Sequence, residues 1–306
     1  MTWNARHWLL VCLVTWAVTS RARSDDSTRL RDLWPEHAPG ETTADRGTPL
    51  PQRANEKPPA TRLAGITCPQ LERFDPPTDR RNGTAILVFP GGGYNYVVSD
   101  KEGSEVAQWL NGLGITAWVV RYRTKPAVST DEPLWRRPLQ DGQRAVRTVR
   151  HHAAQWGLRA DRVGVLGFSA GGLTAAVVAA RFHQPAYEPQ DAIDQQSCRP
   201  DFAMLVYPWK LVDESTGQLA DYLPVSKEHP PTLLIHAHDD GVTSLSSAML
   251  YAALKQHRVP AELHIYQSGG HGFGMRAAAD SPAAAWPAQA AGWLQQQHWL
   301  DVATAP

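Results

Sequence analysis

A serine with glycine two positions away on either side stands in Gly167-Phe168-Ser169-Ala170-Gly171. The apolar run before it, residues 162–166, has the length of a buried strand, and the small residues after it suit a closely packed helix. A strand that turns this tightly into a helix needs the flanking glycines and exposes the serine hydroxyl beside the helix amino terminus. The N–H groups there favour a developing negative charge. We therefore predict that Ser169 is a nucleophile and that Ala170 donates its backbone N–H to an oxyanion.

A serine hydroxyl needs a general base, and the base needs an acid that orients it. His271 lies in Gly269-Gly270-His271-Gly272-Phe273-Gly274, after the last strand pattern at residues 261–266. A histidine flanked by glycine on a loop after a late strand is a candidate base. Asp239 and Asp240 follow the strand pattern at residues 232–236. Physical reasoning on the residues leaves both aspartates open as the acid.

A second glycine-rich loop, Pro90-Gly91-Gly92-Gly93-Tyr94, follows the first strong strand pattern at residues 84–90. Backbone N–H groups can approach a substrate carbonyl there without interference from side chains. The loop has neither the Lys-Ser/Thr of a P-loop nor the G-x-G-x-x-G spacing of a dinucleotide site. We predict that Gly92 and Gly93 complete the oxyanion hole with Ala170.

The elements that position these residues alternate between strand and helix. Strands that are apolar at nearly every residue and are separated by helices indicate a mostly parallel sheet covered on both faces, which is an α/β fold. Strand patterns occupy residues 84–90, 115–122, 162–167, 202–207, 232–236 and 261–266, and helix patterns occupy 102–113, 138–157, 170–182, 246–256 and 283–297.

Composition and charge exclude several other classes of protein. The 306 residues carry 30 basic and 30 acidic side chains, so no net field attracts nucleic acid or anionic lipid. Arg144, Arg147 and Arg150 share one helix face, which we interpret as a solvated face. We expect no metal, because the histidines and cysteines lack ligand spacing, and no cofactor, because acyl transfer to a serine needs none. Cys68 and Cys198 fit a disulfide and a pair of buried thiols equally well.

The amino terminus differs from the rest of the chain. Arg6 precedes an apolar stretch at residues 8–18, followed by small residues, which is typical of a secretory signal peptide over residues 1–22 and predicts a secreted or periplasmic protein. The stretch is too short for a membrane span, so no membrane association is expected after cleavage. Residues 23–61 are predicted to be an extended or partly disordered lead-in, and residues 62–306 a single catalytic domain.

These motifs together resemble secreted bacterial α/β-hydrolases related to acetylxylan and feruloyl esterases, and more distantly the catalytic domain of prolyl oligopeptidases. The resemblance also covers Leu33-Trp34-Pro35, Asp100-Lys101-Glu102-Gly103 and Asp141-Gly142. In that group the acid stands three residues before a valine and eight before a serine. Asp239 matches this spacing with Val242 and Ser247, so the resemblance implies a triad of Ser169, Asp239 and His271.

The resemblance implies a serine carboxylic-ester hydrolase that acts through an acyl-enzyme on a small ester or an esterified polysaccharide, as an acetylxylan esterase does. Two alternatives stay open, namely a serine peptidase of the prolyl-oligopeptidase type and an inert secreted binding protein on a hydrolase scaffold. An inert scaffold gives no physical reason for a strained serine turn, a glycine loop and a glycine-flanked histidine to occur together. The oligomeric state is not predicted.

Overall fold

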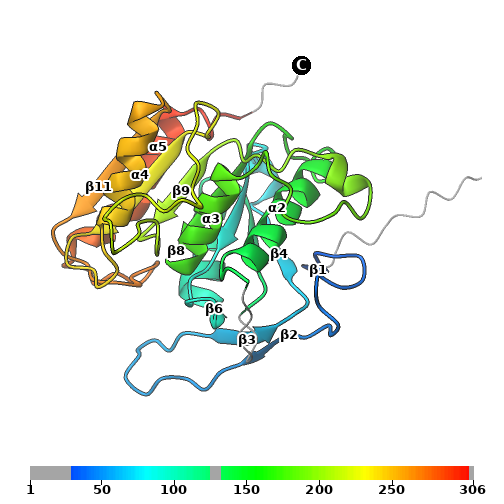
Figure 1. Cartoon of the computed structure of the whole chain (residues 1–306), viewed down its shortest axis with the longest axis horizontal. Coiled ribbons are helices and arrows are strands. Elements are labelled where there is room, and N and C mark those ends of the chain that lie inside the picture. Colours follow the sequence, from blue (N-terminus) through cyan, green and yellow to red (C-terminus); the bar gives the residue numbers. More distant parts are fainter. Residues whose placement is uncertain (1–28, 125–131, 303–306) are drawn as a thin grey trace, which may run out of the picture.

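The centre of the protein is a twisted sheet of eight strands in the order β1-β4-β7-β5-β8-β9-β10-β11 (Figure 1). The computed structural model describes residues 29–124 and 132–302, so the predicted signal peptide lies outside the described residues. The six strands from β7 to β11 in this order pair in parallel, while β1 and β4 are antiparallel to their neighbours. The sheet strands are β1 (Leu30–Asp32), β4 (Gln70–Phe74), β5 (Ala85–Phe89), β7 (Thr116–Arg121), β8 (Val163–Phe168), β9 (Ala203–Val206), β10 (Thr232–Ala237) and β11 (Ala261–Tyr266).

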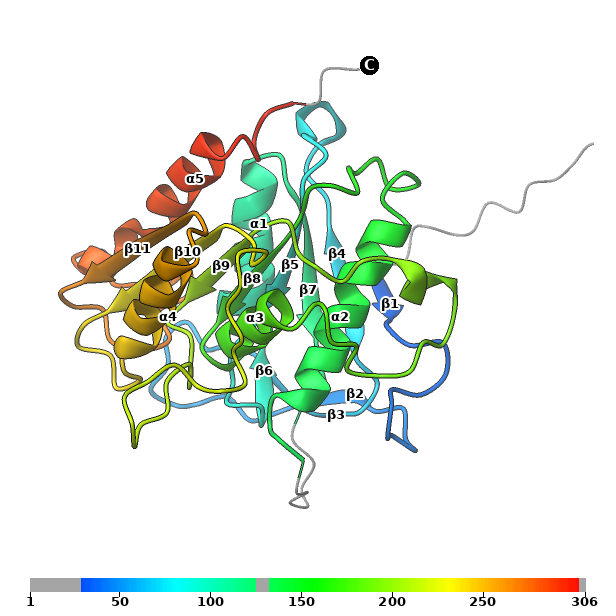
Figure 2. The same ribbon diagram turned by 45° about the horizontal axis from the view of Figure 1, so that its top comes forward.

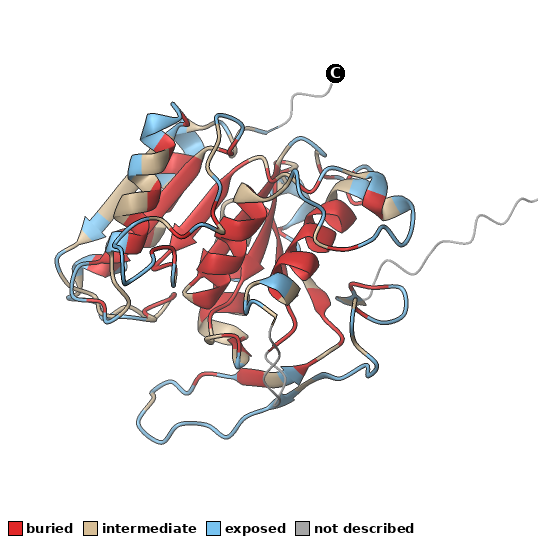
Figure 3. Ribbon diagram, in the orientation of Figure 1, coloured by how far each residue is buried: buried red, intermediate tan, exposed pale blue. Residues whose placement is uncertain are grey.

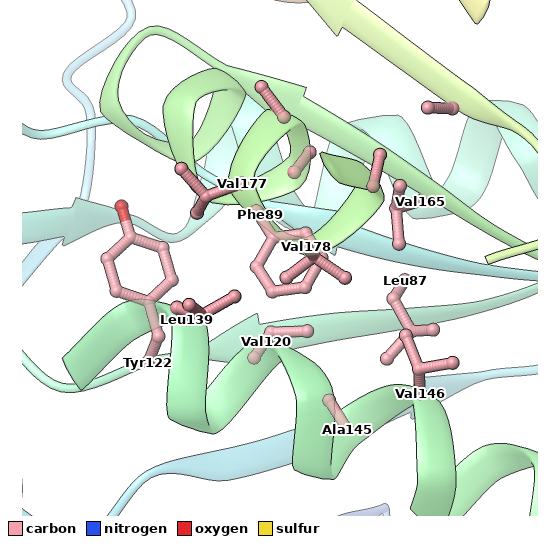
Figure 4. Packing of buried hydrophobic residues seen from close by; sticks show 14 of the residues in the cluster. Leu87, Phe89, Val120, Tyr122, Leu139, Ala145, Val146, Val165, Val177 and Val178 are labelled. Carbon is pink, nitrogen blue, oxygen red and sulfur yellow. The ribbon is translucent and has the colours of Figure 1, made fainter. Parts of the chain in front are cut away.

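Helices cover both faces of this sheet, as the alternation of strand and helix predicted (Figure 2). Alternate residues of β5 enter different cores: Leu87 and Phe89 pack towards one face, and Ile86 and Val88 towards the other. The first core, shown in Figure 4, includes Val177 and Val178. Its helices are α2 (Arg136–His151), α3 (Ala170–Ala180) and α4 (Leu245–Gln256), and those of the second core are α1 (Glu105–Gly112) and α5 (Trp286–Gln296).

A small antiparallel sheet lies beside the main one. It contains β2 (Arg46–Pro49), β3 (Arg62–Ile66) and β6 (Tyr96–Val98). Its strand β6 is attached to the loop after β5, because the Val98 N–H donates to the Gly91 carbonyl at 3.0 Å. The exposed chain between β2 and β3 is the pale blue loop at the bottom of Figure 3. After β6 the chain forms a π-helical turn at Asp100–Ser104 and then enters α1, so the helix expected from residue 102 begins with this turn.

Part of the segment expected to be a lead-in packs against the main domain. β1 pairs with β4, and Leu33 and Trp34 are buried in the first core. The indole N–H of Trp34 donates to Asp141 Oδ1 at 3.0 Å, and Asp141 also accepts from the guanidinium of Arg123. The hydrogen bond to Asp141 attaches Trp34 to α2.

The interpretation of the α2 arginines as a solvated face was wrong. Arg144 and Arg147 are 2% and 8% exposed, because the segment after α3 folds over them. Arg144 donates to both carboxylate oxygens of Asp191 at 2.7 and 2.6 Å, and Arg147 donates to the Tyr187 hydroxyl at 2.7 Å. The three-residue spacing correctly placed the arginines on one face, but it carries no information on which distant segment covers that face.

Candidate active site

Ser169 occupies the turn between β8 and α3 in a strained backbone conformation. Its φ is 53° and its ψ is −117°, a combination that residues with a Cβ rarely adopt. Two close approaches force the turn: a Cβ on Gly167 would lie 2.1 Å from the Gly171 carbonyl oxygen, and one on Gly171 would lie 2.0 Å from that of Phe89. The flanking glycines are therefore required, as the motif predicted, and the turn holds the serine hydroxyl at the carboxyl end of the sheet.

His271 lies within hydrogen-bond distance of Ser169, although 102 residues separate them in the sequence. The distance between Ser169 Oγ and His271 Nε2 is 2.9 Å. The loop after β11 carries the histidine and uses positive φ at Gly270, Gly272 and Gly274. The Tyr207 ring packs edge-on against the imidazole at a centroid distance of 5.0 Å. The structure thus brings together the predicted nucleophile and the predicted base.

The acid beside His271 is Asp240, so the preference for Asp239 was wrong. His271 Nδ1 lies 2.8 Å from Asp240 Oδ2. Asp239 instead accepts the backbone N–H of Gly270 at 2.9 Å through its own Oδ1. The backbone turns directly after β10, with the Asp240 N–H donating to the Ala237 carbonyl, and this turn directs the second carboxylate towards the imidazole. The resemblance implied an acid three residues before Val242. In this chain the aspartate beside His271 lies only two residues before Val242.

The side chain of Asp240 is buried and has several polar partners. The Val242 N–H donates to its Oδ1 at 2.7 Å, and His236 Nε2 lies 3.4 Å from its Oδ2. Burial alone would raise the pKa of Asp240, but hydrogen bonds from His236, His271 and Val242 outweigh it and lower that pKa below its ordinary value. The charged carboxylate can only accept, so Nδ1 of His271 carries a proton and neutral His271 presents Nε2 as an acceptor to Ser169.

The predicted oxyanion donors lie around the Ser169 hydroxyl. Gly92 and Gly93 line the same cavity as Ser169 and His271, and Ala170 begins α3. Within residues 29–124 and 132–302, no hydrogen bond uses the backbone N–H of Gly92, Gly93 or Ala170. A Cβ on Gly92 would lie 1.9 Å from the Tyr96 carbonyl oxygen, which explains why this loop needs glycine. The three N–H groups therefore remain available to a ligand.

The cavity beside Ser169 has a volume of about 380 Å³ and is lined mainly by polar groups. Tyr96 and Trp209 supply aromatic faces, while Asn95, Arg53 and Lys101 supply hydrogen-bond donors. Aromatic faces combined with donors suit a polar ring such as a sugar. The Trp209 backbone N–H donates to the Ser169 carbonyl at 3.0 Å, which attaches the Trp209 backbone to the serine turn.

The cysteines, the possible metal ligands and the length of the helices bear on other functions that the protein could have. Cys68 and Cys198 are both free and buried, so of the two alternatives left open the structure has separate thiols. In the described part of the chain, no cluster of three or more His, Cys, Asp or Glu side chains is arranged to hold a metal ion. None of the helices between residues 29 and 302, the gap at 125–131 aside, combines the length and apolar character needed to cross a membrane.

Comparison with known proteins agrees with this fold. Residues 86–229 match a family described as the alpha/beta hydrolase fold, and residues 199–298 match the prolyl oligopeptidase family. The crystal structure of an acetyl ester-xyloside bifunctional hydrolase from Caldicellulosiruptor lactoaceticus is 31% identical in sequence, with a TM-score of 0.67 over 85% of this chain and 99% of that one. The chain belongs to the α/β-hydrolase fold family.

Two curated relatives have names that refer to xylan. An acetylxylan esterase of Xylanibacter ruminicola is 31% identical over 63% of this chain and 42% of its own length. The endo-1,4-beta-xylanase B of Butyrivibrio fibrisolvens is 28% identical over 61% of this chain and 32% of its own length. The matched region thus spans less than half of either relative.

Proposed function

We propose that this protein is a serine ester hydrolase that removes acetyl or other small acyl groups from carbohydrate outside the cytoplasm. The observation that carries the proposal is the continuous chain of hydrogen-bond distances from Ser169 Oγ through His271 to Asp240, starting at a strained turn. The names of the xylan-related relatives and the polar, partly aromatic cavity support a saccharide ester as substrate. The predicted signal peptide supports export.

The geometry permits a two-step acyl transfer. Ser169 Oγ attacks the ester carbonyl carbon as its proton moves to His271 Nε2, and the carbonyl oxygen becomes an oxyanion facing the N–H groups of Gly92, Gly93 and Ala170. Collapse of the intermediate breaks the bond to the alcohol, which leaves with the proton from Nε2. Water then attacks the acyl-enzyme with His271 as base, which releases the acid and restores Ser169. Asp240 stabilises the imidazolium that forms in both steps.

The deciding experiment measures initial rates on p-nitrophenyl acetate, p-nitrophenyl butyrate, methyl ferulate and acetylated xylan for the wild-type protein and for Ser169→Ala. We expect turnover in the variant to fall by about 10⁶-fold, as for comparable serine triads. We also expect acetate esters to be the best substrates, and the activity to appear in the medium or periplasmic fraction. Equal activity of the variant and the wild type would contradict the proposed nucleophile.

A second candidate is peptide hydrolysis, which the match of residues 199–298 to the prolyl oligopeptidase family favours. That region contains both Asp240 and His271, and the same triad can cleave amides. A chromogenic proline peptide assayed in parallel with the esters distinguishes the two functions. Cleavage of the peptide that depends on Ser169, without comparable ester hydrolysis, would replace the esterase proposal.

A further inference from the structure

A buried carboxylate with no role in the proton transfers lies directly behind the candidate site. Glu102 is 3% exposed and belongs to the π-helical turn before α1, a type of turn frequent at functional sites. It also lines the cavity that contains Ser169. A Cβ on Gly91 would lie 2.7 Å from Glu102 Oε2 and 2.9 Å from the Cβ of Ser169, so only the Gly91 backbone separates the carboxylate from the serine.

The two oxygens of Glu102 accept from two different loops. Oε2 accepts the Gly91 N–H at 2.8 Å, and Gly91 directly precedes the two glycines with free N–H groups. Oε1 accepts the Tyr207 hydroxyl at 2.9 Å. Tyr207 follows β9, and its ring packs against the imidazole of His271.

The Tyr207 hydroxyl connects Glu102 to the loop that carries His271. It donates to Glu102 Oε1, and its oxygen accepts the Gly274 N–H at 2.9 Å. Gly274 belongs to the His271 loop, and the next residue, Met275, donates its N–H to the Lys101 carbonyl at 3.0 Å. The chain from Gly91 through Glu102 and Tyr207 to Gly274 thus connects the glycine loop to the histidine loop.

A carboxylate is a costly way to fill this space. Burial raises the pKa of Glu102, while the hydrogen bonds from Tyr207 and the Gly91 N–H oppose that rise. An apolar side chain of similar volume would fill the space without a desolvation cost. Unlike an apolar group, the carboxylate provides two hydrogen-bond acceptors. These acceptors hold the loop of Gly91 and the loop of Tyr207 at a fixed position relative to each other.

We propose that Glu102 is a positioning residue for the reaction at Ser169, and that it fixes the backbone donors of the Gly91–Gly93 loop relative to the imidazole of His271. The inference rests on the proposed ester hydrolysis. Glu102 touches neither the hydroxyl nor the imidazole through a hydrogen bond, and it acts through Gly91 and Tyr207. Errors of about 1 Å in such groups can reduce rates by about 100-fold.

Glutamine distinguishes this role from simple filling of space. Glu102→Gln preserves the volume but leaves one acceptor oxygen, so the Gly91 N–H and the Tyr207 hydroxyl can no longer both donate to residue 102. Tyr207→Phe preserves the ring beside His271 and removes only the link to Glu102 and Gly274. Glu105→Gln is the matched control, because Glu105 lies in the same helical region and pairs with Arg276 outside this chain of hydrogen bonds.

The test measures kcat and KM on p-nitrophenyl acetate for these variants, for Ser169→Ala, and for the Glu102→Gln/Tyr207→Phe double variant. We expect kcat to fall about 10- to 100-fold in each single variant, with KM within about threefold of wild type, because the lost alignment matters in the transition state. The double variant should lose little more than either single one, since both changes break the same connection. Glu105→Gln should retain the wild-type kcat.

Several outcomes would overturn the inference. An unchanged kcat in both single variants, while Ser169→Ala is inactive, would refute the positioning role and leave the proposed function intact. A raised KM with an unchanged kcat, or independent losses that multiply in the double variant, would also refute it. Should Glu102→Gln fail to fold, Tyr207→Phe decides by the same criteria. A wild-type protein without Ser169-dependent activity would overturn the proposed function and this inference together.

Discussion

At the scale of single residues, two adjacent aspartates have different partners and should differ in their effects on catalysis. Asp240→Asn removes the charge that stabilises the imidazolium and allows the wrong tautomer of His271, so we expect kcat to fall by about 10⁴-fold. Asp239→Asn retains an amide oxygen that can accept from Gly270, so we expect a loss of less than about tenfold. Parallel measurements of kcat on p-nitrophenyl acetate check both expectations. Greater damage from Asp239→Asn would assign the acid to the other aspartate.

The same pair shows what can be predicted from sequence at this scale. Ser169 and His271 are surrounded by glycines whose spacing predicts a turn, and the structure places the two side chains 2.9 Å apart. Nothing comparable marks Asp240. The direction of its side chain depends on His236, on Val242 and on the Gly270 N–H that Asp239 binds. These are tertiary contacts, so the choice between neighbouring carboxylates could not be made from the spacing to a valine.

At the scale of elements, the approach of α3 to the end of β5 positions Ser169, the proposed nucleophile. Gly171→Ala would place a Cβ 2.0 Å from the Phe89 carbonyl oxygen and 2.5 Å from that of Pro90. We expect the substitution to destabilise the fold by about 3 kcal/mol and to reduce kcat, since α3 and the loop after Pro90 must separate. Urea denaturation followed by an esterase assay measures both effects.

Another helical glycine provides the control for that experiment. A Cβ on the exposed Gly292 of α5 would meet no atom within 4 Å. Gly292→Ala should therefore stabilise the protein by up to about 1 kcal/mol through helix propensity and leave activity unchanged. If Gly171→Ala behaved like Gly292→Ala, the close contact between α3 and β5 would not be a constraint on the site.

The elements also show where prediction from sequence ends. Every parallel strand from β5 onward was expected, and most of them, such as β5, β8 and β10, are nearly continuous apolar runs that are buried on both faces. The exception is β11, in which polar residues alternate with apolar ones and no residue is fully buried. The strands β1, β2, β3, β4 and β6 were not expected. β2 is Arg-Gly-Thr-Pro and largely exposed, and β4 contains the adjacent, partly exposed charged residues Glu72 and Arg73. These short strands form by pairing with neighbours that are distant in the sequence, and a local sequence pattern carries no information on such pairing.

At the scale of the whole molecule, the site exists because successive strands deliver their carboxyl ends to one edge of the sheet. β5 leads into Gly91, β8 into Ser169, β9 into Tyr207, β10 into Asp240 and β11 into His271. Parallel strands share a direction, so loops that are distant in sequence converge there. The sheet therefore creates the contacts among Ser169, His271, Asp240 and Glu102, and the stability of the whole fold should set the pH range in which these contacts persist.

The pH range in which the fold is stable should be limited on the acid side by His229, a buried histidine with no role in the proton transfers. Burial lowers its pKa from 6.5 to about 4, its Nδ1 lies 3.1 Å from the Pro230 carbonyl oxygen, and its Nε2 has no partner among the described residues. The folded state thus disfavours the charged form. Well above pH 6.5, His229 is uncharged in both the folded and the unfolded state, so its titration costs no stability. Between pH 6.5 and 4, His229 takes up a proton mainly in the unfolded chain, so the free energy of unfolding falls as the pH falls.

We expect this histidine to account for a loss of about 3 kcal/mol in the free energy of unfolding as the pH falls from 7 to 4. Urea denaturation at half-unit pH intervals measures the slope, and His229→Gln should flatten it, because glutamine does not titrate. His257→Gln, at an exposed histidine, should leave the slope as in wild type. The carboxyl of Asp240, whose pKa is lowered, adds its own loss only below its ordinary value of 3.8, outside this interval. Equal slopes for the wild-type protein and His229→Gln would show that His229 is not the group that limits stability in acid.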